Sequence, residues 1–237
     1  MVRGAVPFGA RPWSTCPGIR RPAGEFVPGV QSIRVRDATA SRSEESRIKL
    51  TRFSRSGLAL PIRELTLWPI QPVDSGELSQ IAAELESRGV RVRLERAVLR
   101  PPGAYDAERA QFRAEVLLDA AHTVSAGPLV AITAADCYAG DLNFVFGIAA
   151  PAGPAVVCLH RLHARADPQT FLGRVAKEIV HELGHTLGLA HCRNRSCVMR
   201  FSNTLADTDA KSELPCSACR KRFQTLIRKP VGRGRVG

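Results

Sequence analysis

The chain has 237 residues, of which 44% are apolar and 5% aromatic, so it can build one domain whose core depends on aliphatic side chains. No run of about 18 apolar residues occurs and no secretory signal opens the sequence, so we expect a cytoplasmic protein with no membrane partner. The formal net charge is +12, but the excess lies at the ends: residues 1–60 hold 11 basic and 4 acidic side chains, and residues 220–237 hold 7 basic and none acidic. Because no nucleic-acid-binding motif accompanies the charge, we do not expect a nucleic acid as partner.

The composition along the chain indicates one central domain between two basic ends. Residues 1–60 are rich in Pro, Gly, Arg and Ser and show no helical or strand period, so we expect a disordered or loosely attached arm. Residues 229–237 form a short basic tail. We therefore place the folded domain in residues 61–228 and predict a monomer.

Hydrophobic periodicity and turn residues predict strands and helices from residue 62 onward. Asp74 and Glu77 resemble a capping box at a helix start, and Gly89 provides a stop. In chain order we predict a strand at 62–68, a helix between Asp74 and Gly89, a strand at 90–99, a helix at 106–121, strands at 128–134, 142–149 and 155–161, a long helix at 169–188, and a final helix at 217–228. This order predicts an α/β (α+β) fold with helices on the faces of a sheet.

The segment from Phe171 to His191 carries the most specific pattern in the sequence. His181 and His185 are four residues apart, so they lie on one face of the predicted helix, about 6 Å apart along its axis. That separation lets two imidazoles bind one zinc ion, and Gly188 allows the chain to turn back so that His191 supplies a third ligand. Three histidines leave one position of a tetrahedral zinc open for water, as in catalytic sites.

Glu182 directly follows the first of these histidines and can face the open side of the metal without binding it. A carboxylate there can take a proton from water and deliver it to a leaving amine, so we predict that Glu182 is the general base. Surface histidines on an ordinary amphipathic helix are the competing interpretation, but the added glycine and third histidine make a chance match rare.

Four of the seven cysteines follow this segment closely or lie a short way downstream. They are Cys192, Cys197, Cys216 and Cys219. Two thiolate pairs at this spacing predict a closed, four-coordinate zinc site of structural type, which would fix the loop that carries His191. Four reduced structural thiols, or a redox-active pair at 216–219, are the alternatives. Cys16, Cys137 and Cys158 are scattered, and no role is assigned to them.

Met199 follows Cys197 by two residues and comes shortly after the third histidine. A methionine in this place can lie in a tight turn beneath the metal, with its thioether packed under the imidazoles. We therefore predict that Met199 supports the site from below, as Gly188 supports it by ending the helix.

Together these residues resemble the archaemetzincin branch of the metzincin metallopeptidases. The resemblance rests on HELGHTLGLAHC at 181–192, CVM at 197–199 and CSAC at 216–219. It extends upstream through ADCYAGDLNFVFGIA at 135–149, CLHRL at 158–162 and the pair Lys177-Glu178, and it covers residues 62–227.

The resemblance implies a compact metzincin-like zincin catalytic domain with a twisted mixed β-sheet, an active-site helix, a Met-turn at Met199 and a four-cysteine zinc module. It implies two zinc ions per chain, one catalytic and one structural. It also implies that an edge strand binds extended peptide backbone by strand addition, for which residues 142–149 are the candidate. No tyrosine follows the Met-turn as it does in some metzincins, and Phe201 stands nearby instead, so no partner is assigned to the developing oxyanion.

We therefore predict a zinc-dependent metallopeptidase that hydrolyses peptide bonds in a peptide or protein substrate. The alternative is a catalytically weak, zinc-stabilised protein that binds peptides or proteins. A nucleic-acid binder that uses the cysteine module and the basic ends is disfavoured, because the basic residues near the cysteines lack interleaved aromatic residues. The sequence does not predict the substrate-binding residues or the cleavage preference.

Overall fold

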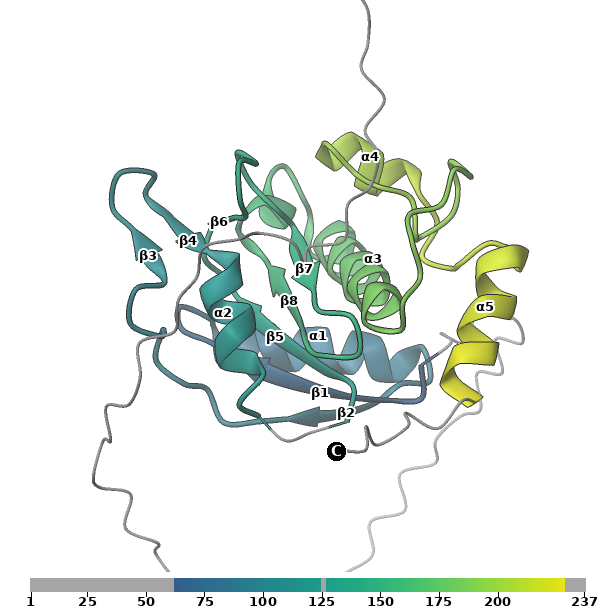
Figure 1. Ribbon diagram of the computed structural model, residues 1–237, viewed down its shortest axis with the longest axis horizontal. Coiled ribbons are helices and arrows are strands. Elements are labelled where there is room, and N and C mark those ends of the chain that lie inside the picture. Colours follow the sequence, from purple (N-terminus) through teal and green to yellow (C-terminus); the bar gives the residue numbers. More distant parts are fainter. Residues whose placement is uncertain (1–61, 125–126, 229–237) are drawn as a thin grey trace, which may run out of the picture. The chain divides into compact units, whose positions relative to one another are not determined.

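A five-stranded mixed sheet forms the centre of the protein, in a computed structural model that describes residues 62–124 and 127–228. The predicted arm at 1–60 and tail at 229–237 lie outside the described residues. In their order across the sheet, the strands are β2 (Arg91–Leu94), β1 (Glu64–Pro69), β5 (Leu129–Thr133), β8 (Ala155–Cys158) and β7 (Gly147–Ala149). The first four are parallel, and β7 pairs with β8 in the antiparallel sense at the edge (Figure 1).

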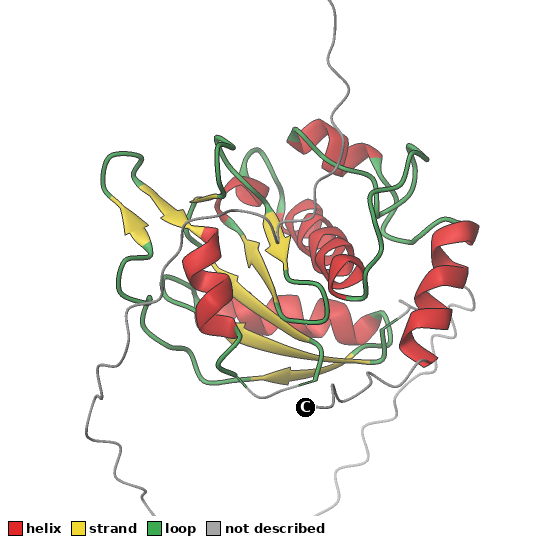
Figure 2. Ribbon diagram, in the orientation of Figure 1, coloured by secondary structure: helices red, strands yellow, loops and turns green. Residues whose placement is uncertain are grey.

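Helices cover both faces of this sheet (Figure 2). On one face lie α1 (Ser75–Ser87) and α3 (Pro168–Thr186), and on the other lies α2 (Ala114–Ala121). α4 (Leu205–Ala210) packs on α3, and α5 (Ser217–Arg228) adds Phe223 to the core of α1 and α3. Successive side chains of a strand point to opposite faces, so β5 sends Val130 and Ile132 into the core shared with α1 and α3. It sends Leu129 and Ala131 into the core shared with α2. The strands β1, β5 and β8 are therefore buried on both faces, as is typical of parallel strands, whereas the edge strand β2 is mostly exposed.

The first predicted helix is confirmed together with its two boundaries. The Asp74 side chain accepts a hydrogen bond from the Glu77 backbone nitrogen at 2.8 Å, which caps the start of α1. Gly89 follows the helix with φ 84°, a conformation that glycine adopts without strain. The strands predicted at 62–68 and 128–134 and the helices predicted at 169–188 and 217–228 are also confirmed. The strand predicted at 155–161 ends at Cys158, and the 3-10 helix η1 (His160–His163) follows it.

The helix predicted at 106–121 is wrong in its first half. A small three-stranded sheet occupies that part, made of β3 (Tyr105–Asp106), β4 (Gln111–Arg113) and β6 (Cys137–Tyr138). Ala110 has φ 52°, a left-handed backbone conformation that a helix interior excludes. Phe112 then pairs with Cys137, so a contact with a distant strand overrides the helical spacing of the apolar residues.

Two predicted strands are shorter in the structure. β2 covers only part of 90–99, and β7 covers only the end of 142–149. Side chains hold the loop before β7 in place of a strand ladder: Arg109 donates to the carbonyl of Leu142 at 3.0 Å, and Gln111 donates to the carbonyl of Asn143 at 2.9 Å. The backbone there is therefore fixed by long-range contacts that periodicity does not reveal.

A disulfide between Cys137 and Cys158 joins the small sheet to the large one. Both residues are buried, and the sequence assigned them no role. Disulfides are rare in reducing compartments such as the cytosol, so this bond gives no support to the predicted cytoplasmic location, which stays a prediction. Within residues 62–124 and 127–228, no helix has the length and apolarity needed to cross a membrane.

Candidate functional site

Helix α3 carries the first two candidate ligands and is anchored firmly in the core. Asp167 caps its start by accepting hydrogen bonds from the backbone nitrogen and the hydroxyl of Thr170, at 2.9 and 2.7 Å. Pro168 occupies the first turn, where its missing N–H leaves no hydrogen bond unmade. At the other end Gly188 has φ 85° and turns the chain away from the helix axis, as predicted.

The three histidines of the sequence pattern converge in the structure. One ring nitrogen from each of His181, His185 and His191 lies within 4.8 Å of the others. The Nε2 atoms of His181 and His185 are 3.1 Å apart. His181 is buried, His185 is half-buried and His191 is exposed, so the cluster opens to solvent on the side of the third histidine.

Backbone carbonyls orient the two helical histidines. Nδ1 of His181 lies 2.8 Å from the carbonyl oxygen of Val198, and Nδ1 of His185 lies 2.7 Å from that of Leu189. A carbonyl oxygen can only accept, so each Nδ1 carries the hydrogen and each Nε2 presents a lone pair. Two lone pairs facing each other at 3.1 Å repel, unless a cation lies between them. A tetrahedral zinc with bonds of 2.0–2.1 Å places two nitrogens about 3.3–3.4 Å apart, so this donor set fits zinc.

The histidines are held in the neutral form that a metal ion requires. Burial lowers the pKa of His181 well below its ordinary value, and the nearby Lys211 ammonium lowers it further. Burial also lowers the pKa of His185. Partial burial beside His185 lowers the pKa of His191 to about 4. At neutral pH all three rings are therefore unprotonated at the nitrogen that faces the cluster.

Glu182 lies between the histidine cluster and the edge strand β7. Its side chain is buried, and a Cβ placed on Gly147 of β7 would come within 2.7 Å of Glu182 Cγ and 2.9 Å of its Oε1. The bare backbone of Gly147 therefore leaves the space that the carboxylate occupies. Burial, followed by the charge of Glu178, raises the pKa of Glu182 well above its ordinary value.

Met199 packs against α3 at Gly184, which lies between the two helical histidines in the sequence. A Cβ placed on Gly184, which lies between them on α3, would overlap the thioether sulfur and approach the Met199 methyl carbon within 2.6 Å. Met199 is fully buried, and its neighbour Val198 supplies the carbonyl that orients His181. The close approach of Met199 to α3 therefore depends on the absence of a side chain at Gly184, and its packing under the imidazoles stays a prediction.

Sequence reasoning missed a buried ion pair one turn before the cluster. Nζ of Lys211 lies 2.9 Å from Oε1 of Glu178, with the two side chains 0% and 4% exposed. The ammonium makes no well-aligned hydrogen bond, whereas the hydroxyl of Thr208 donates to the same carboxylate at 3.3 Å. Lys211 reaches this place because α4, whose start is capped by Thr204, packs on α3. A lone lysine in a polar stretch gives no signal in the sequence.

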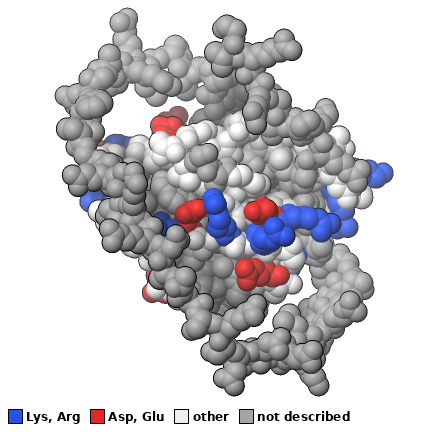
Figure 3. Space-filling model, turned by 90° about the horizontal axis from the view of Figure 1, so that it is seen from below, with Lys and Arg blue, Asp and Glu red and all other residues white. Residues whose placement is uncertain are grey.

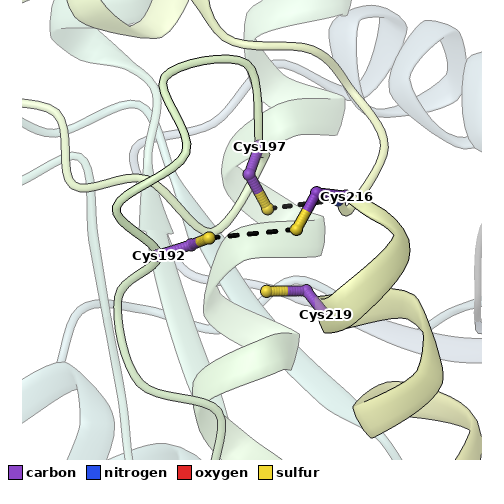
Figure 4. Close-up of side chains that lie close together, drawn as sticks. All are labelled: Cys192, Cys197, Cys216 and Cys219. Carbon is purple, nitrogen blue, oxygen red and sulfur yellow. Dashed lines mark hydrogen bonds between the residues drawn. The ribbon is translucent and has the colours of Figure 1, made fainter.

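The four cysteines form a second cluster beside the first (Figure 4). Cys192 and Cys197 come from the loop after α3, and Cys216 and Cys219 come from the start of α5. Cys192 Sγ lies 3.9 Å from Cys216 Sγ, too far for a disulfide. Four sulfurs around a zinc at 2.3 Å lie about 3.8 Å from one another, so this set also fits zinc.

The thiols of this cluster differ in the direction of their pKa shifts. The pKa of Cys216 is lowered to about 7, mainly by a hydrogen bond from the Cys219 backbone nitrogen. Burial raises the pKa of Cys197 and of Cys219. The Cys216 thiol therefore loses its proton near neutral pH. A bound cation would stabilise the thiolate form of the buried Cys197 and Cys219.

The surface beside the histidines is open and partly aromatic. The Phe201 ring is 46% exposed, and its centre lies 5.0 Å from that of His191. Two cavities of the described part lie elsewhere. One, of about 220 Å³, is bordered by His122 and Gly153, and the other, of about 380 Å³, is bordered by Arg174 and Asp209. Neither cavity includes a residue of the two clusters.

These features define the class of metzincin-type zinc peptidases. They are a helix with two histidines and a glutamate between them, a third histidine after a glycine turn, and a methionine packed against that helix. The model of the family described as Peptidase family M54 matches residues 94–225. By this match and by its relatives, the chain belongs to this family, that of the archaemetzincins.

Two curated archaemetzincins are similar to this chain over most of their own length. The one from Pyrococcus furiosus is 36% identical over 184 residues, which are 71% of this chain and 96% of the relative. The one from Methanopyrus kandleri is 43% identical over 143 residues, 59% of this chain and 81% of the relative.

Solved structures agree with this family. The crystal structure of archaemetzincin from Methanopyrus kandleri has a TM-score of 0.63 and 35% identity, and the match covers 71% of this chain and 97% of that one. The structure from Archaeoglobus fulgidus, complexed with malonate, has a TM-score of 0.61 and 35% identity, with 67% and 99% covered. The mixed α/β fold predicted from the sequence is therefore confirmed.

Proposed function

We propose that this chain is a zinc-dependent peptidase that hydrolyses peptide bonds, with a catalytic zinc on His181, His185 and His191 and with Glu182 as general base. The observation that carries the proposal is the meeting of one ring nitrogen from each of the three histidines, with the buried Glu182 directly after His181 on the same helix. The family, which is one of zinc metallopeptidases, supports the same reaction.

A zinc ion held by three imidazoles, with one position open, polarises a carbonyl and lowers the pKa of water towards about 7. The protein's own contribution is to hold and move a proton. Glu182 takes the proton of the attacking water at a carboxylate oxygen and returns it to the leaving amine. Its raised pKa suits this task, because the carboxyl group can keep the proton between the two steps.

We propose that the substrate backbone binds along the outer edge of β7. The sheet has two edges, β2 and β7, and the β2 edge is lined by the ion pairs Arg91–Glu64 and Arg93–Glu95, at 3.6 and 3.0 Å. Such charged edges disfavour pairing with a further strand. Figure 3 views the protein from below, the side on which β2 lies in Figure 1, and shows basic and acidic side chains close together there. Gly147 places β7 directly beside the carboxylate of Glu182, so a peptide added there passes over the proton acceptor.

We propose that the four-cysteine cluster holds a second, structural zinc. Its sulfur positions suit a closed site without an open position for substrate. The monomeric state and the cytoplasmic location belong to the same proposal and rest on the sequence.

The test compares cleavage of a peptide library by wild type, Glu182→Gln and Glu86→Gln, read by mass spectrometry after equal zinc loading. Glu86 is an exposed glutamate on α1 and controls for the loss of a carboxylate. We expect wild type and Glu86→Gln to produce the same fragments and Glu182→Gln to produce none. Equal cleavage by all three would refute the role of Glu182. Peptide binding without Glu182-dependent cleavage would favour the alternative of a catalytically weak, peptide-binding protein.

A further inference from the structure

The two metal clusters share one stretch of backbone. Leu189 and Val198, whose carbonyl oxygens orient His185 and His181, lie at the two ends of the segment 189–198. The same segment contains His191, the third histidine, and it contains Cys192 and Cys197, two of the four thiols. Every histidine of the first cluster is therefore linked to the segment that supplies half of the second cluster.

Apart from the hydrogen bond from the Ser212 nitrogen to the carbonyl of Ser196, at 3.0 Å, few contacts outside the segment hold its middle. Residues 193–196 are exposed, and they contain two arginines, an asparagine and a serine, which offer no apolar surface to bury. The loop is closed at its neck by the hydrogen bond from the Cys192 nitrogen to the carbonyl of Met199, at 2.9 Å. Beyond this bond, Cys192 is attached to the rest of the fold through its thiol, which faces Cys216, the residue directly before α5. Fixing that thiol fixes the residue next to His191.

We propose that occupancy of the four-cysteine cluster by zinc sets the affinity of the three-histidine site for its metal, so that the two sites load cooperatively. The inference rests on the proposed function for the presence of zinc in both clusters. Groups that orient metal-bound histidines change metal affinity by about 10–100-fold when they are removed. Here those groups are the carbonyls of Leu189 and Val198, and the cysteine cluster holds the loop between them.

A competing arrangement would make the two sites independent. Leu189 and Val198 are themselves 3% and 0% exposed, so core packing alone could hold their carbonyl oxygens in place. The zinc affinity of the histidine site would then not depend on whether the cysteine cluster holds zinc. Measured affinities separate the two arrangements without any measurement of peptide cleavage.

The experiment uses the full chain and changes the cysteines that lie farther from the histidines in the sequence. Cys216 precedes α5 and Cys219 lies in its first turn, so Cys216→Ser with Cys219→Ser leaves the histidines and the segment 189–198 unchanged. Phe223 of α5, which packs near Gly184 of α3, is also unchanged. Zinc dissociation constants are measured by competition with a chelator, and the histidine site is identified as the one that His185→Ala removes. Ser217→Ala, an exposed change in the same helical turn, is the control.

We expect zinc at the histidine site to bind about 10–100-fold more weakly in the double cysteine variant and unchanged in Ser217→Ala. An affinity within twofold of wild type in a folded double variant would overturn the inference, whether or not the protein cleaves peptides. Conversely, coupled binding without cleavage would leave the inference standing and refute the proposed function.

A reciprocal measurement decides the matter if the cysteine variant fails to fold. Linkage requires that a metal ion bound at the histidine site tighten metal binding at the cysteine cluster by the same factor, so a variant without the histidine site should bind the cysteine-cluster metal more weakly. Cobalt(II) bound to thiolates has a distinct absorption, so titration of His191→Ala with cobalt(II) reports the cysteine cluster directly. We expect the same 10–100-fold weakening relative to wild type, and an unchanged cobalt(II) affinity would overturn the inference.

Discussion

Glu182 and Gly147 are in direct contact across the edge of the sheet: a Cβ on Gly147 would lie 2.7 Å from Glu182 Cγ. This spacing is below any real carbon–carbon contact, so Gly147→Ala must displace the carboxylate or the strand. We expect a fall in kcat of at least about tenfold, with zinc content unchanged, because the histidines are not touched. Gly127→Ala, which has open space around its Cβ, is the control and should keep wild-type kcat. Full activity of Gly147→Ala would show that the contact does not position the base.

Lys211→Met should destabilise the fold strongly. Lys211 is 0% exposed and pairs with the buried Glu178, so its removal leaves a buried carboxylate without a counter-charge. Breaking such a pair costs about 3–5 kcal/mol of unfolding free energy, measurable by urea denaturation. Lys211→Met combined with Glu178→Gln should recover most of the loss, since no buried charge is left. Equal stability of the single and the double variant would contradict this explanation.

The stability of the zinc-free protein should fall with pH below about 6.5, the ordinary pKa of histidine. The three cluster histidines have folded-state pKa values below that of the unfolded chain, and that of His191 is about 4. The unfolded chain then binds more protons, so this contribution is present above pH 6.5 or so and is lost as the pH falls.

Unfolding in urea with a chelator, at several pH values, measures this slope. His181→Gln with His185→Gln should show a shallower loss of stability. Glu182 acts in the opposite sense through its raised pKa, but it is present in both proteins and cancels in the comparison. A slope identical in the two proteins would contradict the assigned pKa directions.

Removal of the Cys137–Cys158 disulfide should loosen the edge strand. The bond closes a loop of sequence separation 21 that contains all of β7. Replacing both cysteines with alanine should lower the unfolding free energy by about 2–4 kcal/mol, mainly by enlarging the unfolded ensemble. Hydrogen exchange at Gly147 should become faster as well. Unchanged exchange and stability would mean that the pairing does not constrain the strand.

The candidate site could be predicted because its chemistry is local in the sequence. His181, Glu182 and His185 lie on one helix, and a turn at Gly188 follows within a few residues, so helical geometry and one glycine turn bring His191 to the same place. The cysteine cluster was also predictable, since thiols at these spacings have few other uses.

The parts that escaped prediction depend on distant partners. Phe112 lies in a strand because it pairs with Cys137, and Lys211 is buried because α4 packs on α3. No local property of either residue encodes these contacts. The role of Gly147 depends likewise on the approach of α3 to β7, which only the folded chain defines.

The most direct test of the central claim is the number of zinc ions per chain, measured by elemental analysis in wild type, His185→Ala and His160→Ala. His160 is an exposed histidine outside both clusters and serves as the control. The account predicts two zinc ions in wild type and in His160→Ala, and one in His185→Ala. Two zinc ions retained in His185→Ala would contradict a catalytic zinc held by the histidines of α3.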